Sequence, residues 1–488
     1  MRSQAAIVAL TLVSSVTAFW RMPCRSQTGK ARIDPILDYG EISAHVHTIH
    51  GGGGFGFDAT YDTLTAEDSC TSCEVTQDHS AYWTPTLHFL YTNGIAVMVD
   101  QVGGMLAYYL YYLTNVTAFQ EGFQMVAGNP LLRNFSGPFP DTDLSSWPTD
   151  PTDQFFLQQR ALGFNCLNYA IDPEASLYRH EFPTKDYMDA NCLDGLRLEL
   201  AFPSCGNGSA TSTDGKSHVA YPSLVKEGNC PEGFDTHLPF MFFETIWNTY
   251  AFAGDDGQFV LSMGDPTGTG YHGDFMMGWE SKEFLQSALD TCTSETGEIS
   301  DCDLFTIQDD SVGAQCTFPV PDVLADDNVE GPRSGLPVAV PIQYGPDNAT
   351  TYAVAGRSGV ATSSVSVSSA PSTWSDRATL SYSAANPSVT STALGGIVVN
   401  VAASSAGQKY GVDSSSTQST SSSSITAAPL IESAAASPDP VTTSYITQGN
   451  EVIEMAIVEV EVTVTATPTA GAKHRRHLAK HQHHAVRR

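Results

Sequence analysis

Short apolar or aromatic stretches, separated by Gly, Pro, Asn and Asp, dominate residues 19–320. Runs of about four to eight such residues between turn formers are typical of strands rather than helices. We therefore expect a mainly β domain over this region, a β-sandwich or jelly roll stapled by disulfides and containing few helices. Clear examples of such runs are residues 95–100, 240–243 and 259–263.

Two segments refine this picture. Residues 106–113 are rich in tyrosine, which favours a strand that presents aromatic rings on both faces. Residues 281–291 are the best candidate for a helix, because their apolar residues recur at helical spacing. Those apolar residues are Phe284, Leu285, Ala288 and Leu289.

The composition changes between residues 322 and 346, where cysteines stop and Ser, Thr, Ala and Val take over. Ten of the eleven residues 414–424 are Ser or Thr. Such a segment buries too little apolar surface to offset chain entropy. We expect residues 321–447 to be a disordered Ser/Thr-rich tail or an O-glycosylated stalk.

The last part of the chain, residues 448–488, has its own character. Residues 458–465 alternate strictly between apolar and polar positions, which indicates an extended segment that is either solvated or added to another sheet. Residues 473–488 hold six Lys/Arg, five His and no acid. This basic end could tether the chain to acidic polymers, be processed after its paired arginines, or be a solvated tail.

Residues 1–18 predict an exported protein. They carry an early Arg2, an apolar run over residues 5–13 and the small-residue end Val16-Thr17-Ala18. This order is that of a cleaved signal peptide, and the apolar run is too short to span a bilayer. We therefore expect a secreted, extracellular or wall-located protein without a membrane span.

Cysteine usage agrees with export. All ten cysteines precede residue 317, which predicts five disulfides within one folded unit. Cys70 and Cys73 resemble a redox or zinc pair, but no second Cys-x-x-Cys exists, so we expect their sulfurs to go to different partners. Sequons that fit a glycoprotein begin at Asn115, Asn134, Asn207 and Asn348.

The charge excludes one class of partner. The chain has 23 Lys+Arg against 53 Asp+Glu, a formal net charge of −30. Proteins that bind nucleic acids attract phosphate with clustered basic residues, so we expect no nucleic-acid partner.

Histidine supplies the first candidate chemistry. Residues 45–50 read His-Val-His-Thr-Ile-His and are followed by four glycines. On a strand, His45 and His47 project to the same side, where they could ligate a metal or divide acid and base roles. The glycines would allow close approach of a ligand. The alternative is a strand end with hydrogen-bonded histidines and a flexible turn.

Further candidates lie downstream, in a segment around His218, a segment around His237 and the glycine-rich residues 264–279. Carboxylates beside an imidazole can set its tautomer and raise its basicity. No Gly-x-Ser-x-Gly or His-Glu-x-x-His motif occurs. The candidate catalytic residues are therefore His45, His47, His218, His237, Asp265, His272 and Asp274.

Aromatic residues accompany these clusters along the chain. Flat rings beside carboxylates and imidazoles suit stacking on sugar rings, although ordinary core packing explains them equally well. The candidate substrate-binding residues are Trp83, Tyr221, Tyr271 and Trp279.

The order of several blocks resembles a large family of secreted fungal proteins catalogued as a domain of unknown function. The resemblance covers residues 19–320 and implies a fungal source and an extracellular location, but no activity. One departure is at residues 206–208, Gly-Asn-Gly, where the family pattern has Trp-Asp-Gly. The blocks are residues 19–24 (FWRMPC), 45–50 (HVHTIH), 78–85 (DHSAYWTP), 218–222 (HVAYP) and 264–279.

These observations lead to three hypotheses of function. The first is an enzyme, a glycoside hydrolase or lyase acting on wall or plant polysaccharide, with Asp265, Asp274 or Glu244 as its carboxylates or with His or Tyr as its base. The second is a non-catalytic protein that binds cell-wall glycan. The third is an extracellular protein that binds metal through its histidines.

Overall fold

The computed structural model describes residues 19–137, 141, 153–356, 442–448 and 451–457. The chain divides into two compact units, residues 1–410 and 411–488. Within the second unit, β18 (Thr442–Gln448) and β19 (Glu451–Ile457) pair as an antiparallel hairpin. The expected extended segment 458–465, the expected signal peptide 1–18 and the basic end lie outside the described residues. Everything below concerns the first unit.

One five-stranded antiparallel sheet has the order β1-β7-β14-β10-β9. Tyr108 and Tyr109 on β7 belong to apolar clusters on opposite faces of this sheet, which confirms the strand with aromatics on both faces. The strands are β1 (Phe19–Cys24), β7 (Gln101–Leu110), β9 (Leu162–Cys166), β10 (Leu196–Ala201) and β14 (Phe240–Trp247).

The second five-stranded sheet has the order β2-β3-β4-β16-β8 and is also antiparallel. Its central strand, β4, pairs with β3 on one side and with β16 on the other. The strands are β2 (Gly29–Ala31), β3 (His47–Gly51), β4 (Ala81–Pro85), β8 (Gln124–Gly128) and β16 (His272–Met276).

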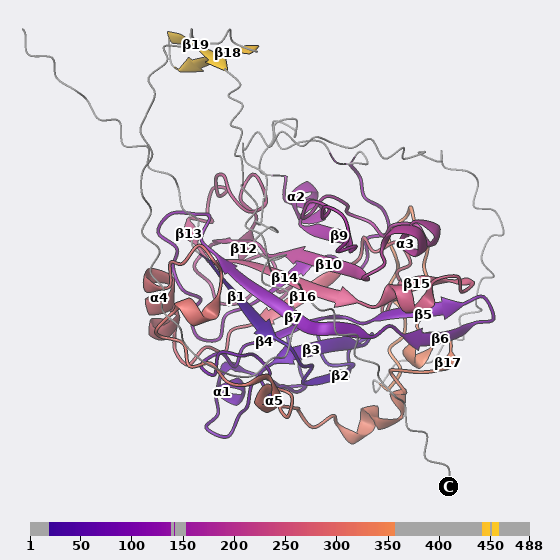
Figure 1. Cartoon of the computed structure of the whole chain (residues 1–488). Coiled ribbons are helices and arrows are strands. Elements are labelled where there is room, and N and C mark those ends of the chain that lie inside the picture. The colour runs from indigo at the N-terminus through magenta and orange to yellow at the C-terminus, as the bar shows by residue number, and fades with distance from the viewer. Residues whose placement is uncertain (1–18, 138–140, 142–152, 357–441, 449–450, 458–488) are drawn as a thin grey trace, which may run out of the picture. The chain divides into compact units, whose positions relative to one another are not determined.

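The main core lies between these two sheets (Figure 1). The rings of Tyr82 on β4 and Phe243 on β14 meet edge to face at 5.6 Å. A Cβ on Gly273 of β16 would lie 2.6 Å from Cδ2 of Leu200 on β10, so a larger residue here would force that side chain to move. The arrangement confirms the predicted mainly β, disulfide-stapled sandwich.

Two smaller antiparallel sheets extend the sandwich, in the orders β15-β5-β6-β17 and β12-β11-β13. The first contains β5 (Leu87–Tyr91), β6 (Ile95–Met98), β15 (Gly257–Leu261) and β17 (Arg333–Ser334). The second contains β11 (Cys205–Gly206), β12 (Val219–Ala220) and β13 (Thr236–His237).

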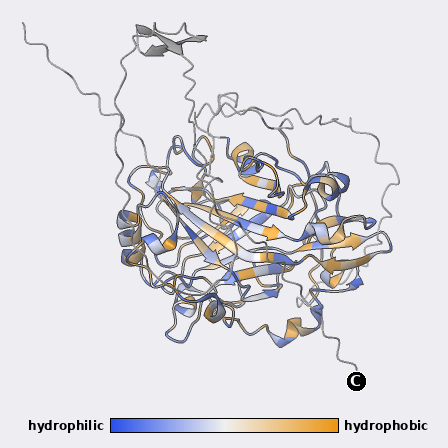
Figure 2. Cartoon of the chain, in the orientation of Figure 1, coloured by the Kyte–Doolittle hydropathy of each residue, from blue (hydrophilic) through white to orange (hydrophobic). Residues whose placement is uncertain are grey.

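The helices are short, and α4 matches the predicted helix. Ser281 caps its N-terminus by accepting a hydrogen bond from the amide of Phe284, and Leu285, Ala288 and Leu289 are buried. Figure 2 shows apolar residues along the strands and many polar ones on α4. The α-helices are α1 (Tyr61–Leu64), α2 (Gln154–Arg160), α3 (Lys185–Asn191), α4 (Lys282–Thr291) and α5 (Asp310–Gly313); 3-10 turns are η2 (Thr249–Phe252), η3 (Ile299–Asp301), η4 (Asp322–Asp327) and η5 (Pro337–Ala339).

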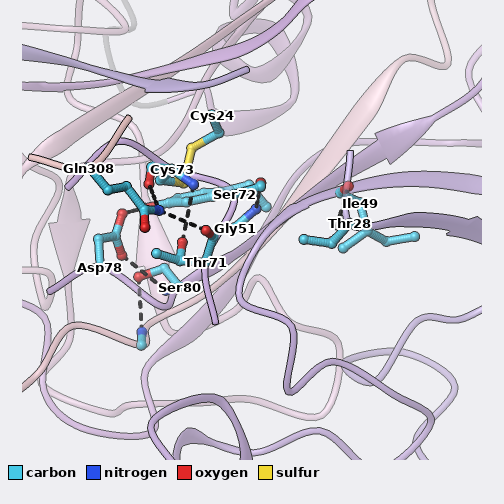
Figure 3. The surroundings of a disulfide bond; sticks show 12 residues. Cys24, Thr28, Ile49, Gly51, Thr71, Ser72, Cys73, Asp78, Ser80 and Gln308 are labelled. Atoms are coloured by element: carbon cyan, nitrogen blue, oxygen red, sulfur yellow. Dashed lines mark hydrogen bonds between the residues drawn. A yellow bond between two sulfur atoms is a disulfide. The ribbon is translucent and has the colours of Figure 1, made fainter. Parts of the chain in front are cut away.

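Five disulfides use all ten cysteines, as predicted. Cys70 and Cys73 go to different partners, which confirms that they are not a redox or zinc pair. Around Cys73 the Gln308 amide donates to the carbonyls of Thr71 and Cys73 (Figure 3). The bridges are Cys24–Cys73, Cys70–Cys316, Cys166–Cys192, Cys205–Cys230 and Cys292–Cys302.

The packed part of the chain continues past residue 320, where the sequence places the start of the linker. Leu324 and Leu336 are buried against the body, and Asp327 pairs with the buried Arg32 at 2.7 Å. The folded domain therefore extends beyond residue 320, into the segment where the composition already changes. Among the described residues, no helix combines the length and the apolar character that crossing a membrane requires.

Candidate metal centre

The outer face of the sheet β2-β3-β4-β16-β8 carries the most unusual group of polar side chains in the described structure. Side chains alternate along β16, so that Gly273 and Phe275 face the main core while His272 and Asp274 face outward. On β3, His47 faces outward in the same way and lies opposite Pro85 of β4. Because β4 is the only strand between β3 and β16, the side chains of His47 and His272 meet above it.

Three imidazoles converge at this point. The ring centroids of His45 and His47 are 4.3 Å apart, and His272 lies 5.0 Å from His45 and 5.9 Å from His47. One ligand nitrogen of each ring lies within 4.8 Å of the others. The Nε2 atoms of His45 and His272 are separated by only 3.1 Å. Two nitrogens about 2.0–2.1 Å from one zinc ion lie roughly 3.3 Å apart at a tetrahedral angle.

Backbone carbonyls orient two of the rings. Nδ1 of His47 donates to the carbonyl of Ile33 at 3.1 Å, and Nδ1 of His272 donates to that of Gly270 at 2.9 Å. Each bond places the proton on Nδ1 and leaves Nε2 as the lone-pair atom. The Nε2 of His47 is buried and has no hydrogen-bond partner among the described residues. Metal-ligating histidines show this arrangement, in which the second nitrogen donates to a carbonyl.

The environment keeps the three rings neutral. Burial lowers the pKa of His45 and His47 well below the ordinary value, and neighbouring histidines lower it further. Burial lowers the pKa of His272 to about 4. A neutral imidazole is the form that binds a metal ion, so these rings need not lose a charge before they act as ligands.

Two carboxylates adjoin the histidines. Asp34, His47 and Asp274 form a second group whose ligand atoms lie within 4.8 Å of one another. Neither oxygen of Asp274 has a hydrogen-bond partner among the described residues, although the side chain is fully buried. One oxygen of Asp34 accepts from the amides of Ile36 and Leu37. Since His47 has one free nitrogen and belongs to both groups, the two groups compete for one ion.

The electrostatic balance near these carboxylates is negative. Burial raises the pKa of Asp274 well above its ordinary value, Asp34 raises it further, and Lys216 opposes both. Lys216 donates to the carbonyl of Gly128 at 2.5 Å, and burial lowers its pKa. Asp34 and Asp38 thus both repel the charged form of Asp274 while Lys216 attracts it, and an added cation would relieve the repulsion among these carboxylates.

Solvent has little access to the group. The exposed fractions are 8% for His45, 3% for Asp34 and 2% or less for His47, His272 and Asp274. A buried polar atom without a partner is costly, so the orphan atoms of His47 and Asp274 require an explanation. A cation bound by either group would give the orphan Nε2 of His47 a partner, and one bound by the group with Asp34 would also contact Asp274.

The other predicted catalytic residues lie outside this group. Asp265 is buried beside Arg133 at 3.6 Å and accepts hydrogen bonds from Thr267 and from the amide of Gly270, so its oxygens are occupied within the protein. His218 bonds Ser212 through Nδ1 at 2.9 Å. His237 lies on β13 in the separate three-stranded sheet.

The four predicted sugar-stacking residues are buried. Trp83, Tyr271 and Trp279 have no exposed surface and Tyr221 has 5%. Trp83 packs against Phe55, and the other three donate hydrogen bonds inside the protein or pack in the core. In this structure the four rings are therefore part of the core. Core packing was the alternative to sugar stacking that the sequence left open.

The glycines after the histidine segment are needed for close packing within the protein. A Cβ on Gly51, whose φ is +89°, would lie 1.9 Å from the carbonyl oxygen of Ser80. A Cβ on Gly53 would lie 2.6 Å from Sγ of Cys70. These glycines allow the chain to pass close to its own backbone and to a disulfide, rather than to a ligand.

Comparison with protein families places this site within one known domain. Residues 34–279, just over half of the chain, match the model described as "Domain of unknown function (DUF1996)". The chain belongs to this family. The match begins at Asp34, so the DUF1996 domain contains all five side chains of the two groups. Comparisons with curated proteins and with solved structures found no match.

Sequence reasoning missed Asp34 and Lys216 as parts of this site. Asp34 precedes a proline and lies in no recognisable motif, and Lys216 occurs in a loop with the ordinary turn residues Asp214 and Gly215. No signal in a single sequence identifies either residue, because both reach the site through the folding of the loops that cover the DUF1996 sheet.

Proposed function

We propose that this DUF1996 protein is a secreted metal-binding protein, and that it holds a first-row transition-metal ion such as Zn²⁺ through His45, His47 and His272. The observation that carries the proposal is the convergence of three buried, neutral imidazoles, two of them held by backbone carbonyls with Nε2 directed to a common point. Imidazole is a preferred ligand of zinc, copper and nickel. Secretion, a fungal source and glycosylation enter this proposal from the sequence.

The burial of the site favours a structural role for the ion. Structural metal sites are closed, whereas catalytic sites keep one position open to water or substrate. The ligands also come from segments more than 220 residues apart, His45 and His47 near the start of the domain and His272 near its end. An ion held by all three would join the two ends of the DUF1996 domain.

The test is elemental analysis of the purified full-length protein, followed by chelation and reloading. We expect about one equivalent of transition metal, and a chelated sample that takes up Zn²⁺ again with a higher Tm. A metal-free sample that neither reloads nor gains thermal stability would rule the proposal out.

Binding to cell-wall or plant polysaccharide remains our second proposal. A partly exposed cavity beside β13, lined by polar groups and a tyrosine, favours binding. Cleavage has less support, because Asp265 and Asp274 are fully buried. Incubation with insoluble glucan, chitin and mannan tests binding by retention, and new reducing ends or unsaturated sugars would reveal cleavage. Absence of both in a folded sample would remove this second proposal.

A further inference from the structure

The cavity beside β13 has a volume of about 400 Å³. Three segments form its wall: the residues after β7, the loop that holds Cys230, and the strand that holds His237. This volume lies within the range of small-molecule sites in proteins. The cavity belongs to the DUF1996 domain but to a different sheet from the metal ligands.

Covalent and hydrogen bonds hold the wall in place. The disulfide Cys205–Cys230 ties the loop to β11, which pairs with β13. Nδ1 of His237 donates to the carbonyl of Thr114 at 2.6 Å, and the amide of Thr117 donates to the carbonyl of His237 at 2.8 Å. The three segments are therefore connected to one another, as expected of a preformed site.

Several polar groups in the cavity are available to a ligand. Within the part of the chain that the structure describes, the side chains of Tyr112, Thr114, Asn229 and Asp235 have no hydrogen-bond partner. The Nδ1 bond of His237 leaves its Nε2 as an acceptor. The cavity thus offers hydroxyl, amide, carboxylate and imidazole groups, together with the part of the Tyr112 ring that Phe240 and Lys226 leave uncovered.

The charged residues that line the cavity indicate which class of ligand it can bind. Asp235 is the one acidic group among the lining residues, and no Lys or Arg lines the cavity. The ammonium of Lys226 lies 5.0 Å from the centroid of the Tyr112 ring, but this side chain is buried and does not line the cavity. A phosphate or sulfate would find no basic partner there, and the net charge of −30 would repel it. A neutral molecule with many hydroxyl groups matches the mixture of donors, acceptors and an aromatic ring.

We infer that this cavity binds a neutral sugar residue of an oligosaccharide, with Asp235, Asn229 and His237 as its hydrogen-bonding groups. The inference rests on the second proposed function, binding to polysaccharide. It assigns that binding to the cavity beside β13. It gives His237 a role in binding rather than in catalysis. The sequon at Asn115 is next to Thr114, so the chain's own glycan must be removed before the cavity is tested.

The experiment uses the full chain with Asn115→Gln in every sample. Binding of neutral gluco-, chito- and manno-oligosaccharides is measured by calorimetry for this background, for Asp235→Ala and His237→Ala, and for the control Asp256→Ala. Asp235 and Asp256 are both exposed, so neither change disturbs the core. We expect each cavity variant to weaken binding at least tenfold, the control to leave it unchanged, and a chelator to have no effect.

The outcomes separate the two ideas. Retention on a polysaccharide that persists unchanged in both cavity variants would overturn the cavity as the site and leave the second proposed function intact. Absence of binding to any soluble or insoluble glycan would overturn both. Binding that Asp235→Ala and His237→Ala weaken, while the control does not, supports both.

Discussion

Nε2 of His45 lies 3.1 Å from Nε2 of His272, although 227 residues separate them in the chain. Since Nδ1 of His272 donates to Gly270, its Nε2 is an acceptor and His45 supplies the proton between the two rings. If His45 carried its proton on Nδ1 instead, both Nε2 atoms would present lone pairs and could hold a metal ion between them. The structure thus holds two candidate ligand atoms at nearly the spacing that one ion requires.

Replacement of His47 by Gln should remove metal binding. Among the described residues His47 has a buried Nε2 without a hydrogen-bond partner, and it belongs to both ligand groups. We expect its loss to weaken Zn²⁺ binding by at least about 100-fold, measured by competition with a chromophoric chelator. His50→Gln is the matched control, since His50 is equally buried on the same strand but bonds Gln101 at 2.9 Å. Equal losses in the two variants would contradict the assignment.

Replacement of Asp274 by Asn should stabilise the metal-free protein and reduce the further stabilisation that added metal gives. Asp274 is buried near Asp34 and finds no hydrogen-bond partner in the described part of the chain, so a neutral side chain of the same shape removes an electrostatic penalty. We expect a higher Tm for the metal-free variant than for metal-free wild type, together with a smaller rise in Tm when metal is added. Such an exchange is typical of functional sites. Glu244→Gln, which removes a carboxylate bonded to Tyr108, should instead lower the Tm.

The candidate metal centre shows how much of a site can be predicted from the sequence. The spacing of His45 and His47 predicts that they share a side, because side chains alternate along a strand. The glycine-rich segment marks His272 and Asp274 as candidates. Their meeting depends on β4, which pairs with both β3 and β16. Strand order is a long-range property, so single-sequence patterns could not select these four residues from the seven candidates.

The fold itself is more readily predicted than the site. Short apolar runs indicate strands, and α4 has both the helical period and a Ser cap. The different partners of Cys70 and Cys73 follow from the absence of a second Cys-x-x-Cys, whereas their identities, Cys316 and Cys24, require coordinates. Aromatic rings near polar motifs were ambiguous because core packing and sugar stacking select the same residue types.

His88 should make the stability of the fold depend on pH. Burial, aided by the charge of Arg333, lowers the pKa of His88 to about 3 in the folded protein. The unfolded chain takes up a proton at about pH 6.5, and the folded chain does not. The stability contributed by neutral His88 is therefore complete above about pH 6.5 and is lost as the pH falls toward 3. Between pH 7 and pH 5 the loss is about 2 kcal/mol.

Urea unfolding of His88→Gln at these two pH values checks this prediction. The variant lacks the titrating ring, so its free energy of unfolding should fall by about 2 kcal/mol less than that of wild type between pH 7 and pH 5. The comparison is made within each protein, so a general destabilisation by the substitution does not affect it. An identical pH dependence in the two proteins would show that His88 is not the group involved.

The disulfide between Cys70 and Cys316 should contribute more stability than the one between Cys205 and Cys230. The first closes a separation of 246 residues and the second one of 25. Loop-closure entropy then predicts losses of about 5.5 and about 3.5 kcal/mol when each pair is replaced by alanine. The pairs are comparable in burial, since each joins one buried cysteine to a more exposed one. Denaturant unfolding of the two double variants measures the difference, and equal losses would show that native-state contacts, rather than loop length, determine it.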